Sequence, residues 1–303
     1  MLSRYRIGTR GSKLALAQTQ LTINLLRSLE PQADFTIEII ASRGDIHCET
    51  PIQNLGEQGL FTAELEKQLL DGRVDIVVHS AKDLPTQMPA GLTIAAYSAR
   101  IDPREVLISR DNIKLTDLPP GARIGTSSPR RKTQLAQWRS DLTFTDIRGN
   151  VDTRIRKVRQ GDYQATIMAH AGLLRLNLDN EVAEVFSPEM ILPAAGQGAL
   201  ALQCRRNDQR VCSLLSLANH EPTAQCVRAE RRVLKLLEAG CSCPIGVLAG
   251  FPPDTSTPKN RPMMLRACRC DPETNARIDA HALGPAEDWQ TLAQQVADRL
   301  RNK

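Results

Sequence analysis

The chain has 303 residues, of which 41% are hydrophobic and 24% charged, and its formal net charge is +5. This length predicts about two or three domains. Because no run of about eighteen apolar residues occurs, we expect a soluble globular protein without a transmembrane helix. The first residues lack the apolar core of a signal peptide, and eight cysteines at irregular positions indicate reduced thiols in a cytosol rather than a disulfide framework.

Residues 1–100 alternate between predicted strands and helices, a pattern typical of an α/β domain. We expect strands over residues 5–9, 35–40 and 74–79, and helices over residues 13–29 and 60–70. In the first helix, apolar residues at helical spacing are Leu14, Ala17, Leu21 and Leu25. In the second helix they are Phe61, Leu65 and Leu69, which we predict to lie in the core. Gly72 is the predicted C-terminal cap of the second helix.

The start of the first helix is a possible anion site. Ser12 is placed as its N-cap directly after Arg10 and Gly11, and a helix N-terminus with a nearby guanidinium can hold an anion. A simple capping serine beside a surface arginine explains the same residues equally well.

The stretch VDIVVHSAKDLPT, residues 74–86, places polar residues after an apolar run. The run suits a buried strand of a parallel sheet, and ligands of open α/β sheets bind beyond the carboxyl ends of such strands. Ser80, Lys82 and Asp83 are therefore candidate site residues. The alternative is an ordinary solvated pair of charges.

A second α/β unit follows from about residue 103 to residue 192, with strands expected over 105–108, 123–126, 143–147 and 165–168. Its basic residues cluster, which indicates nucleic acid or a small polyanion as ligand. They are Arg123, Arg130, Arg131, Lys132, Arg139, Arg148, Arg154, Arg156, Lys157 and Arg159. Because aromatic residues make up only 3% of the chain, stacking platforms for single strands are scarce, and a small polyanion is preferred over nucleic acid.

Two strand-to-helix junctions of this unit carry the candidate receptor groups. In the first, Ser128 is the predicted N-cap and Pro129 the first helical residue; its polar residues are Thr126, Ser127, Ser128, Arg130 and Arg131. Free backbone N–H groups, hydroxyls and guanidinium groups together form a carboxylate or phosphate receptor, unless the cluster is only a solvated basic face. The second junction, residues 146–154, turns through Gly149 and carries Arg148 and Arg154. Residues 192–198 are small, flexible and apolar, which fits either a linker that crosses back to the first domain or a turn beneath a ligand.

Beyond residue 219 the pattern predicts a small α+β domain. We expect a helix over residues 222–238 ended by Gly240, strands over 245–250, 262–267 and 277–282, and a closing helix over 289–300. The loop after the first helix carries Cys241 and Cys243, and a second CxC pair is formed by Cys268 and Cys270. Three interpretations stay open for these thiols: a zinc site with unusually short spacing, small buried thiols, or a nucleophile on an exposed loop.

Taken together, these stretches resemble the porphobilinogen deaminase family, also called hydroxymethylbilane synthases, of tetrapyrrole biosynthesis. The matching segments span nearly the whole chain in the family's order: GTRGSKLALAQ, SRGD, GLFTAELE, HSAKDLPT, GTSSPRRKTQLA, IRGNVDTRIRK, AGLLRL, LPAAGQGALALQCR and GCSCPIG. The resemblance implies two α/β domains similar to periplasmic binding proteins, residues 1–99 with 197–217 and residues 100–196, and a small α+β third domain, residues 218–303.

The resemblance also implies the site. A dipyrromethane cofactor would be bound through a thioether to Cys241, and Asp83 would be the catalytic carboxylate. The acetate and propionate groups would be bound by Arg10, Ser12, Lys82, Thr126, Ser128, Arg130, Arg131, Arg148 and Arg154. No metal is implied. The sequence departs from the family pattern at Gln58, Pro129 and Cys243.

The implied reaction condenses four porphobilinogen units head to tail on the cofactor, with release of ammonia, to give hydroxymethylbilane. The growing chain is a polyanion, which explains the many arginines, and a carboxylate at Asp83 suits the cation left by ammonia loss. We expect a cytoplasmic monomer that binds neither nucleic acid nor membrane. The competing hypothesis is a non-catalytic two-domain receptor or sensor of anionic ligands, against which the Gly-Cys loop argues.

Overall fold

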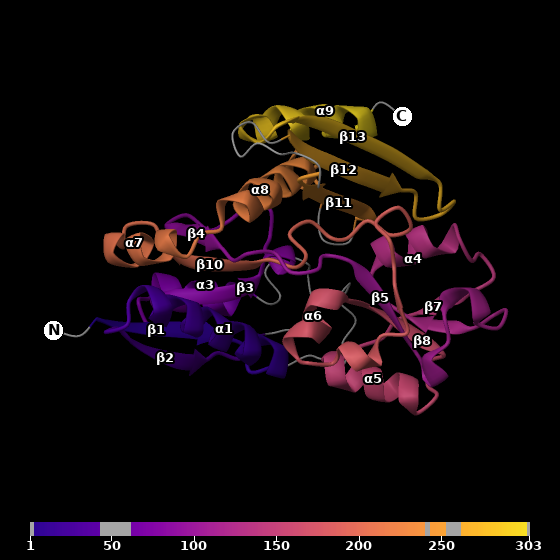
Figure 1. Cartoon of the computed structure of the whole chain (residues 1–303), viewed down its shortest axis with the longest axis horizontal. Coiled ribbons are helices and arrows are strands. Elements are labelled where there is room, and N and C mark those ends of the chain that lie inside the picture. The colour runs from indigo at the N-terminus through magenta and orange to yellow at the C-terminus, as the bar shows by residue number, and fades with distance from the viewer. Residues whose placement is uncertain (1–2, 43–61, 240–242, 253–261, 302–303) are drawn as a thin grey trace. The chain divides into compact units, whose positions relative to one another are not determined.

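The computed structural model of the chain describes residues 3–42, 62–239, 243–252 and 262–301 (Figure 1). The chain divides into two compact units, Met1–Ile101 with Ala199–Ala224, and Asp102–Gly198 with Gln225–Lys303. Two mixed five-stranded sheets with helices, together with a three-stranded antiparallel sheet, confirm the predicted α/β fold class with a small α+β part.

The sheet of the first unit has the order β2-β1-β3-β10-β4. Its strands are β1 (Arg4–Thr9), β2 (Asp34–Ile39), β3 (Ile76–Ser80), β4 (Leu92–Tyr97) and β10 (Leu200–Arg205). Strands β1, β2 and β3 are parallel, as the apolar run before the Asp83 loop predicts. Strand β10 is antiparallel to both β3 and β4, so the sheet is mixed.

Helices cover both faces of this sheet. Helices α1 (Lys13–Leu29) and α7 (Gln209–Leu217) lie on one face, where Ile23 and Leu215 pack in one apolar cluster, and α3 (Ala63–Leu70) lies on the other with Leu69 buried. The apolar spacing that predicted α1 does not mark its buried face, because Leu21 is 50% exposed and Leu25 is 38% exposed. The buried residues of α1 are Gln18, Thr19, Thr22, Ile23 and Leu26.

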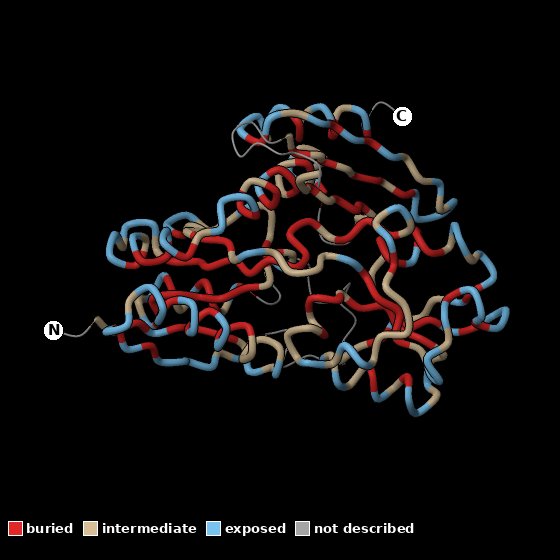
Figure 2. Tube along the Cα trace, in the orientation of Figure 1, coloured by how far each residue is buried: buried red, intermediate tan, exposed pale blue. Residues whose placement is uncertain are grey.

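The second unit contains the sheet β7-β6-β8-β5-β9. Its strands are β5 (Glu105–Ser109), β6 (Arg123–Gly125), β7 (Thr143–Thr145), β8 (Ala165–Ala169) and β9 (Glu184–Val185). Strands β6, β7 and β8 are parallel, and β5 runs antiparallel to β8. Helix α4 (Pro129–Ala136) packs on one face through Leu135, while α5 (Val151–Arg159) and α6 (His170–Arg175) pack on the other. Figure 2 shows inner strands such as β3, β5, β8 and β10 buried along most of their length, and the helices alternating between buried and exposed positions.

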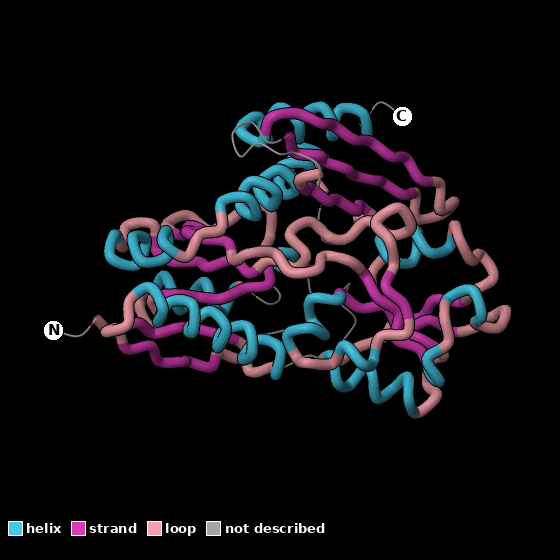
Figure 3. The backbone as a smooth tube through the Cα atoms, in the orientation of Figure 1, coloured by secondary structure: helices cyan, strands magenta, loops and turns pink. Residues whose placement is uncertain are grey.

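The three-stranded antiparallel sheet is formed by β11 (Ile245–Gly250), β12 (Pro262–Cys270) and β13 (Arg277–Pro285). Helices α8 (Glu221–Leu236) and α9 (Trp289–Arg301) contribute Val233 and Val296 to its core, and Figure 3 shows α9 beside the sheet. Helix α8 ends before the expected Gly240. Glu238 takes the left-handed conformation with φ of 52°, and the N–H of Ala239 donates to the Leu234 carbonyl at 3.0 Å, which closes the helix as a glycine would.

Candidate active site

The first unit brings two predicted loops to one edge of its sheet. Strands β1 and β3 are neighbouring parallel strands, paired through Ile7 with Ile76. The carboxyl ends of neighbouring parallel strands lie at the same edge, so the residues after β1 and those after β3 are gathered there. These residues are Arg10, Ser12, Ser80, Lys82 and Asp83.

Hydrogen bonds hold the residues at this edge of the sheet in place. Ser12 caps α1, since its Oγ accepts the N–H of Ala15 at 3.2 Å, as predicted. Gln18 of α1 donates through Nε2 to the Ser80 Oγ at 2.9 Å, which ties the helix to the end of β3. The N–H of Ala81 donates to the Ala199 carbonyl at 3.0 Å, so the loop is also anchored to the chain just before β10.

Asp83 is the last residue of a 3₁₀ turn, Ala81–Asp83. Its neighbours Ala81 and Leu84 are 0% and 3% exposed, whereas Asp83 itself is exposed. Within the described part of the chain its carboxylate makes no hydrogen bond or ion pair. Two buried anchors therefore hold an accessible carboxylate at the sheet edge.

A buried polar chain lies behind this loop and is not predicted by the sequence. His79 of β3 shares a 2.8 Å hydrogen bond through Nε2 with the Gln203 side-chain oxygen, and Gln203 donates to Glu66 at 3.0 Å. Burial raises the pKa of Glu66, although its bonds to Gln203 and Thr62 oppose the shift. The three residues come from β3, β10 and α3, so only the folded sheet brings them together.

The second unit has an equivalent edge. Strand β6 lies between β7 and β8, all parallel, and their carboxyl ends lead into α4, α5 and α6. Ser128 caps α4 as predicted, with Pro129 as the first helical residue and the Arg131 N–H donating to the Ser128 Oγ at 3.4 Å. Thr126 accepts the Ser128 N–H at 3.2 Å, and Ser127 donates to the Ile147 carbonyl at 3.1 Å, which joins the first junction to the second.

Arg130 and Arg131 are buried around one carboxylate. Both guanidinium groups donate to Glu105, from Arg130 Nη2 to Oε1 at 2.5 Å and from Arg131 Nη2 to Oε2 at 2.8 Å. Glu105 is 0% exposed and starts the antiparallel strand β5, which brings it to this edge. Burial lowers the pKa of Arg130, and the neighbouring Arg131 cation lowers it further. Two cations share one anion, so the cluster keeps a net positive charge.

The second junction also turns as predicted. Gly149 has a φ of +107°, and its carbonyl accepts a hydrogen bond from Arg154 Nε at 2.8 Å. The Arg148 carbonyl accepts from Lys157 Nζ at 3.3 Å, whereas the half-buried Arg148 side chain has no hydrogen bond or ion pair among the described residues. Arg148 is therefore available to an external anion.

Arg175, at the end of α6, completes the cationic set and is absent from the sequence prediction. Its Nη2 donates to the Gly198 carbonyl at 2.8 Å, and no carboxylate contacts it within residues that the structure describes. Burial lowers the pKa of Arg175 to about 10. The segment AGLLRL contains this residue, but helical spacing alone does not distinguish it from a surface arginine.

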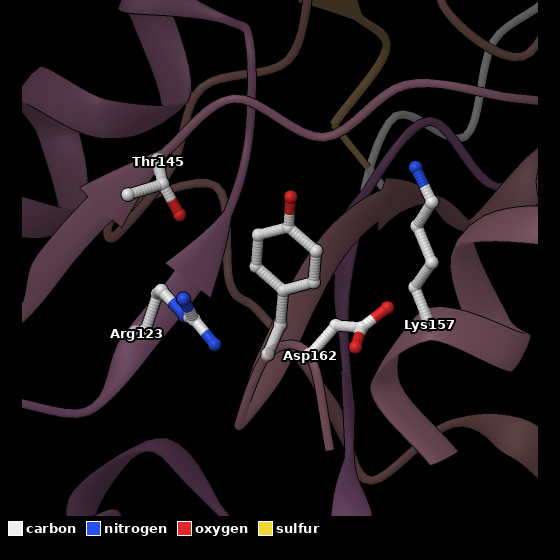
Figure 4. A pocket seen from close by; sticks show the side chains of 5 residues that line it. Arg123, Thr145, Lys157 and Asp162 are labelled. Carbon is white, nitrogen blue, oxygen red and sulfur yellow. The ribbon is translucent and has the colours of Figure 1, made fainter. Parts of the chain in front are cut away.

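A polar pocket of ≈ 310 Å³ lies beside the second junction and contains none of the predicted carboxylate-binding residues. Figure 4 shows Arg123 and Lys157 on opposite sides of this pocket, with Asp162 between them. Arg123 also stacks over the Tyr163 ring, 5.4 Å from its centroid. Two cations and one carboxylate line this pocket, so it also keeps a net positive charge.

The predicted attachment residue Cys241 and the departure Gln58 lie outside the described residues. Cys243 is half-buried, and Cys268 and Cys270 are buried on strand β12. Among the described ranges no group of three metal-ligating side chains comes together. No helix in those ranges is long and apolar enough to span a membrane.

Comparison with known proteins agrees with this geometry. Residues 5–213 match the family described as "Porphobilinogen deaminase, dipyromethane cofactor binding domain", and residues 224–302 match "Porphobilinogen deaminase, C-terminal domain". The porphobilinogen deaminase of Brevibacillus brevis is 40% identical over 99% of this chain and 94% of its own length. The Syntrophomonas wolfei protein of the same name is 47% identical, with 80% of each chain covered.

Two solved structures to which the chain is similar are distant from it in sequence. The methionine-binding protein MetQ is 10% identical, with 71% of this chain and 89% of that chain covered and a TM-score of 0.45. The periplasmic VFT2 domain of Bordetella pertussis BvgS is 14% identical, with 76% and 93% covered and a TM-score of 0.41.

The fold defines an α/β protein that gathers cationic side chains at the edge of its second sheet. More specifically, the chain belongs to the porphobilinogen deaminase family, a family of enzymes whose larger domain binds the dipyrromethane cofactor.

Proposed function

We propose that this chain condenses four porphobilinogen units head to tail into hydroxymethylbilane and releases ammonia at each addition. The observation that carries the proposal is the excess of guanidinium groups over carboxylates at the edge of the second sheet. Each porphobilinogen adds two carboxylates, so a growing product needs such an excess. Family membership supports the same reaction.

The residues at that edge fit a dipyrromethane group. The Nε of Arg131 is buried without a hydrogen-bond partner among the described residues. Arg175 is half-buried, burial lowers its pKa to about 10, and within the described ranges its side chain bonds only to a backbone carbonyl. Buried donors of this kind are costly unless they are paired, so a ligand with several carboxylates satisfies them. We expect Arg131, Arg148 and Arg175 to hold those carboxylates. When bound, the cofactor supplies the pyrrole end to which substrate is added.

Asp83 is proposed as the catalytic carboxylate. Loss of ammonia from porphobilinogen leaves an electron-deficient cation, which a fixed anion stabilises. The Asp83 carboxylate is accessible, while buried Ala81 and Leu84 hold its backbone, so little reorganisation is needed when the charge develops. The same carboxylate is suited to move the proton that the departing ammonia takes up.

Substitution at Asp83 tests this role. An opposite charge at about 4 Å and an effective dielectric of about 20 is worth roughly 4 kcal/mol, so Asp83→Asn should lose about three decades in turnover. Asp83→Glu keeps the negative charge and should retain part of the turnover. Single-turnover ammonia release from cofactor-loaded protein separates chemistry from loading. If loaded Asp83→Asn releases ammonia at the parental rate, another group stabilises the cation.

Cys241 is proposed as the attachment residue for the cofactor. The purified protein should be heavier than its sequence by one dipyrromethane, and Cys241→Ser should lose that mass. Cys243→Ser is the matched control, because it removes the neighbouring thiol and should keep the adduct. An adduct that survives in Cys241→Ser and disappears in Cys243→Ser would reverse the assignment.

We further propose that the enzyme works in the cytoplasm as a monomer. The expected compartment rests on the eight cysteines at irregular positions, which indicate reduced thiols rather than a disulfide framework. Sedimentation over a range of concentrations checks the second part: a mass that rises above that of one chain would contradict it.

A further inference from the structure

Cys204 and Cys212 are brought into contact by the fold of the first unit. Cys204 lies on β10 and Cys212 on α7, and their Sγ atoms are 3.6 Å apart. Cys204 is 0% exposed, whereas Cys212 is half-buried, so one sulfur of the pair reaches the surface. The reaction proposed above uses neither thiol.

The two sulfurs have different environments. Burial and the hydrogen bond with Cys212 raise the pKa of Cys204 to about 12. The two sulfurs share a hydrogen bond in which either thiol can donate, and Cys212 is the more accessible nucleophile because Cys204 is buried. Cys212 Sγ also lies 3.6 Å from the Arg205 carbonyl, so its side chain is held against the start of the β10–α7 turn.

We propose that Cys212 and Cys204 form a reversible disulfide when the protein meets a hydroperoxide. The Cys212 sulfur attacks one peroxide oxygen, the O–O bond breaks, and Cys212 becomes a sulfenic acid while the other oxygen leaves as water. The Cys204 sulfur then attacks the Cys212 sulfur and expels hydroxide, which leaves as water with the Cys204 proton. Two thiols lose two electrons and two protons, and one hydrogen peroxide becomes two waters.

The geometry favours this bond over one between Cys268 and Cys270. The sulfurs must approach from 3.6 Å to about 2.05 Å, which side-chain rotation between a strand and a facing helix can supply. Cys268 and Cys270 are both buried and lie two residues apart on one strand, where Cβ atoms are separated by about 6.6 Å. Disulfides need a Cβ separation of about 3.5 to 4.5 Å, so that pair should stay reduced.

A disulfide here would attach α7 covalently to the sheet. Strand β10 is hydrogen-bonded on both sides, to β3 and to β4, and is therefore the better anchored partner. Helix α7 leads directly into residues 218–224, the last part of the first unit. Oxidation should raise the thermal midpoint of that unit.

The test treats the reduced, cofactor-loaded full chain with stoichiometric hydrogen peroxide and maps its peptides without reduction. We expect one Cys204–Cys212 link, a mass loss of two hydrogens, reversal by dithiothreitol and a higher midpoint by circular dichroism. Cys212→Ser should abolish the mass loss, and Cys204→Ser should leave a sulfenic acid at Cys212 that dimedone traps. Cys270→Ser is the matched control and should still form the link.

Two results would overturn the proposal. One is that the Cys204 and Cys212 peptides stay unlinked while other thiols oxidise. The other is that Cys212→Ser still loses two hydrogens, which would place the disulfide elsewhere. Because neither thiol belongs to the proposed catalytic residues, these outcomes are independent of whether the chain makes hydroxymethylbilane.

Discussion

At Gly149 the backbone reaches φ of +107°, and a Cβ there would lie 2.5 Å from the Thr153 Cγ2. The residue thus combines a conformation that favours glycine with a close approach inside the first turn of α5. Gly121 offers a matched comparison, with φ of +75° and no heavy atom within 4 Å of its would-be Cβ.

Gly121→Ala should cost about 1 to 2 kcal/mol from backbone strain alone. Gly149→Ala should cost roughly 1 to 3 kcal/mol more, because Thr153 must also move. Both tryptophans, Trp138 and Trp289, belong to the second unit, so urea unfolding followed by their fluorescence reports on it. Equal losses of unfolding free energy in the two variants would show that Thr153 moves away from the new Cβ at no cost.

Arg148 and Arg131 differ in how their side chains are paired. Arg148 has no acidic partner among the described residues, whereas Arg131 is bonded to buried Glu105. One charge-assisted hydrogen bond to substrate is worth roughly 1.5 to 3 kcal/mol, so Arg148→Leu should lower kcat/KM by roughly 10- to 150-fold at unchanged stability. Arg131→Leu should lose both activity and stability. Normal turnover in both variants, measured with urea midpoints, would contradict the carboxylate-receptor assignment.

At the scale of elements, Glu105 joins α4 to β5. Its two oxygens accept from Arg130 and Arg131, and these arginines also donate to the carbonyls of Leu192, at 2.7 Å, and Ile167, at 2.9 Å. The carboxylate thus sets the position of both cations at the helix start. A sequence reading that assigns these cations only to ligand binding misses this internal partner.

Glu105→Gln should destabilise the second unit by about 3 to 5 kcal/mol, because two buried guanidinium groups lose the only carboxylate that pairs with them among the described residues. Tryptophan fluorescence during urea unfolding measures the loss. Asp141→Asn is the control, since the Asp141 side chain is 40% exposed and pairs with Arg139 at the surface. A loss for Glu105→Gln no larger than for Asp141→Asn would mean that the cluster is solvated rather than buried.

At the scale of the whole molecule, Asp102 makes stability depend on pH. It begins the second unit, accepts from Arg104 at 2.6 Å, and shares a 2.9 Å hydrogen bond with His170 Nδ1. Burial opposes the charged form, but the bonds from Arg104 and His170 prevail and lower the pKa of Asp102 from 3.8 to about 2. His170 Nε2 also lies 2.6 Å from Asp179, so the network joins the segment before β5, helix α6 and the 3₁₀ turn Asp179–Glu181.

This depressed pKa contributes stability above the unfolded value of 3.8, and the contribution is lost as the pH falls through about 2. The shift corresponds to roughly 2 kcal/mol. Asp102→Asn should therefore lower the stability of the second unit by about this amount at pH 7. The difference in unfolding free energy between Asp102→Asn and the parent protein should become smaller as the pH falls from 4 toward 2. A difference in unfolding free energy that stays constant across that range would show that Asp102 is not the titrating group.

Local features of this protein follow from the sequence by itself. The caps at Ser12 and Ser128, the turns at Gly72, Gly149 and Gly161, and the helix Lys13–Leu29 depend on neighbours within a few residues, so short patterns predict them. The ordered family motifs likewise identify the family, as the comparisons confirm. Domain boundaries and the roles of Asp83 and Cys241 stay predictions.

Only the tertiary structure decides how distant segments meet. Strand β10 inserts antiparallel between β3 and β4, more than a hundred residues after either, and this pairing explains the polar chain from His79 to Gln203. Glu105, the partner of Arg130 and Arg131, comes from strand β5. The exposure of Leu21 depends on which face of α1 packs against the sheet. Such contacts follow from packing across the whole sheet, which no local pattern encodes.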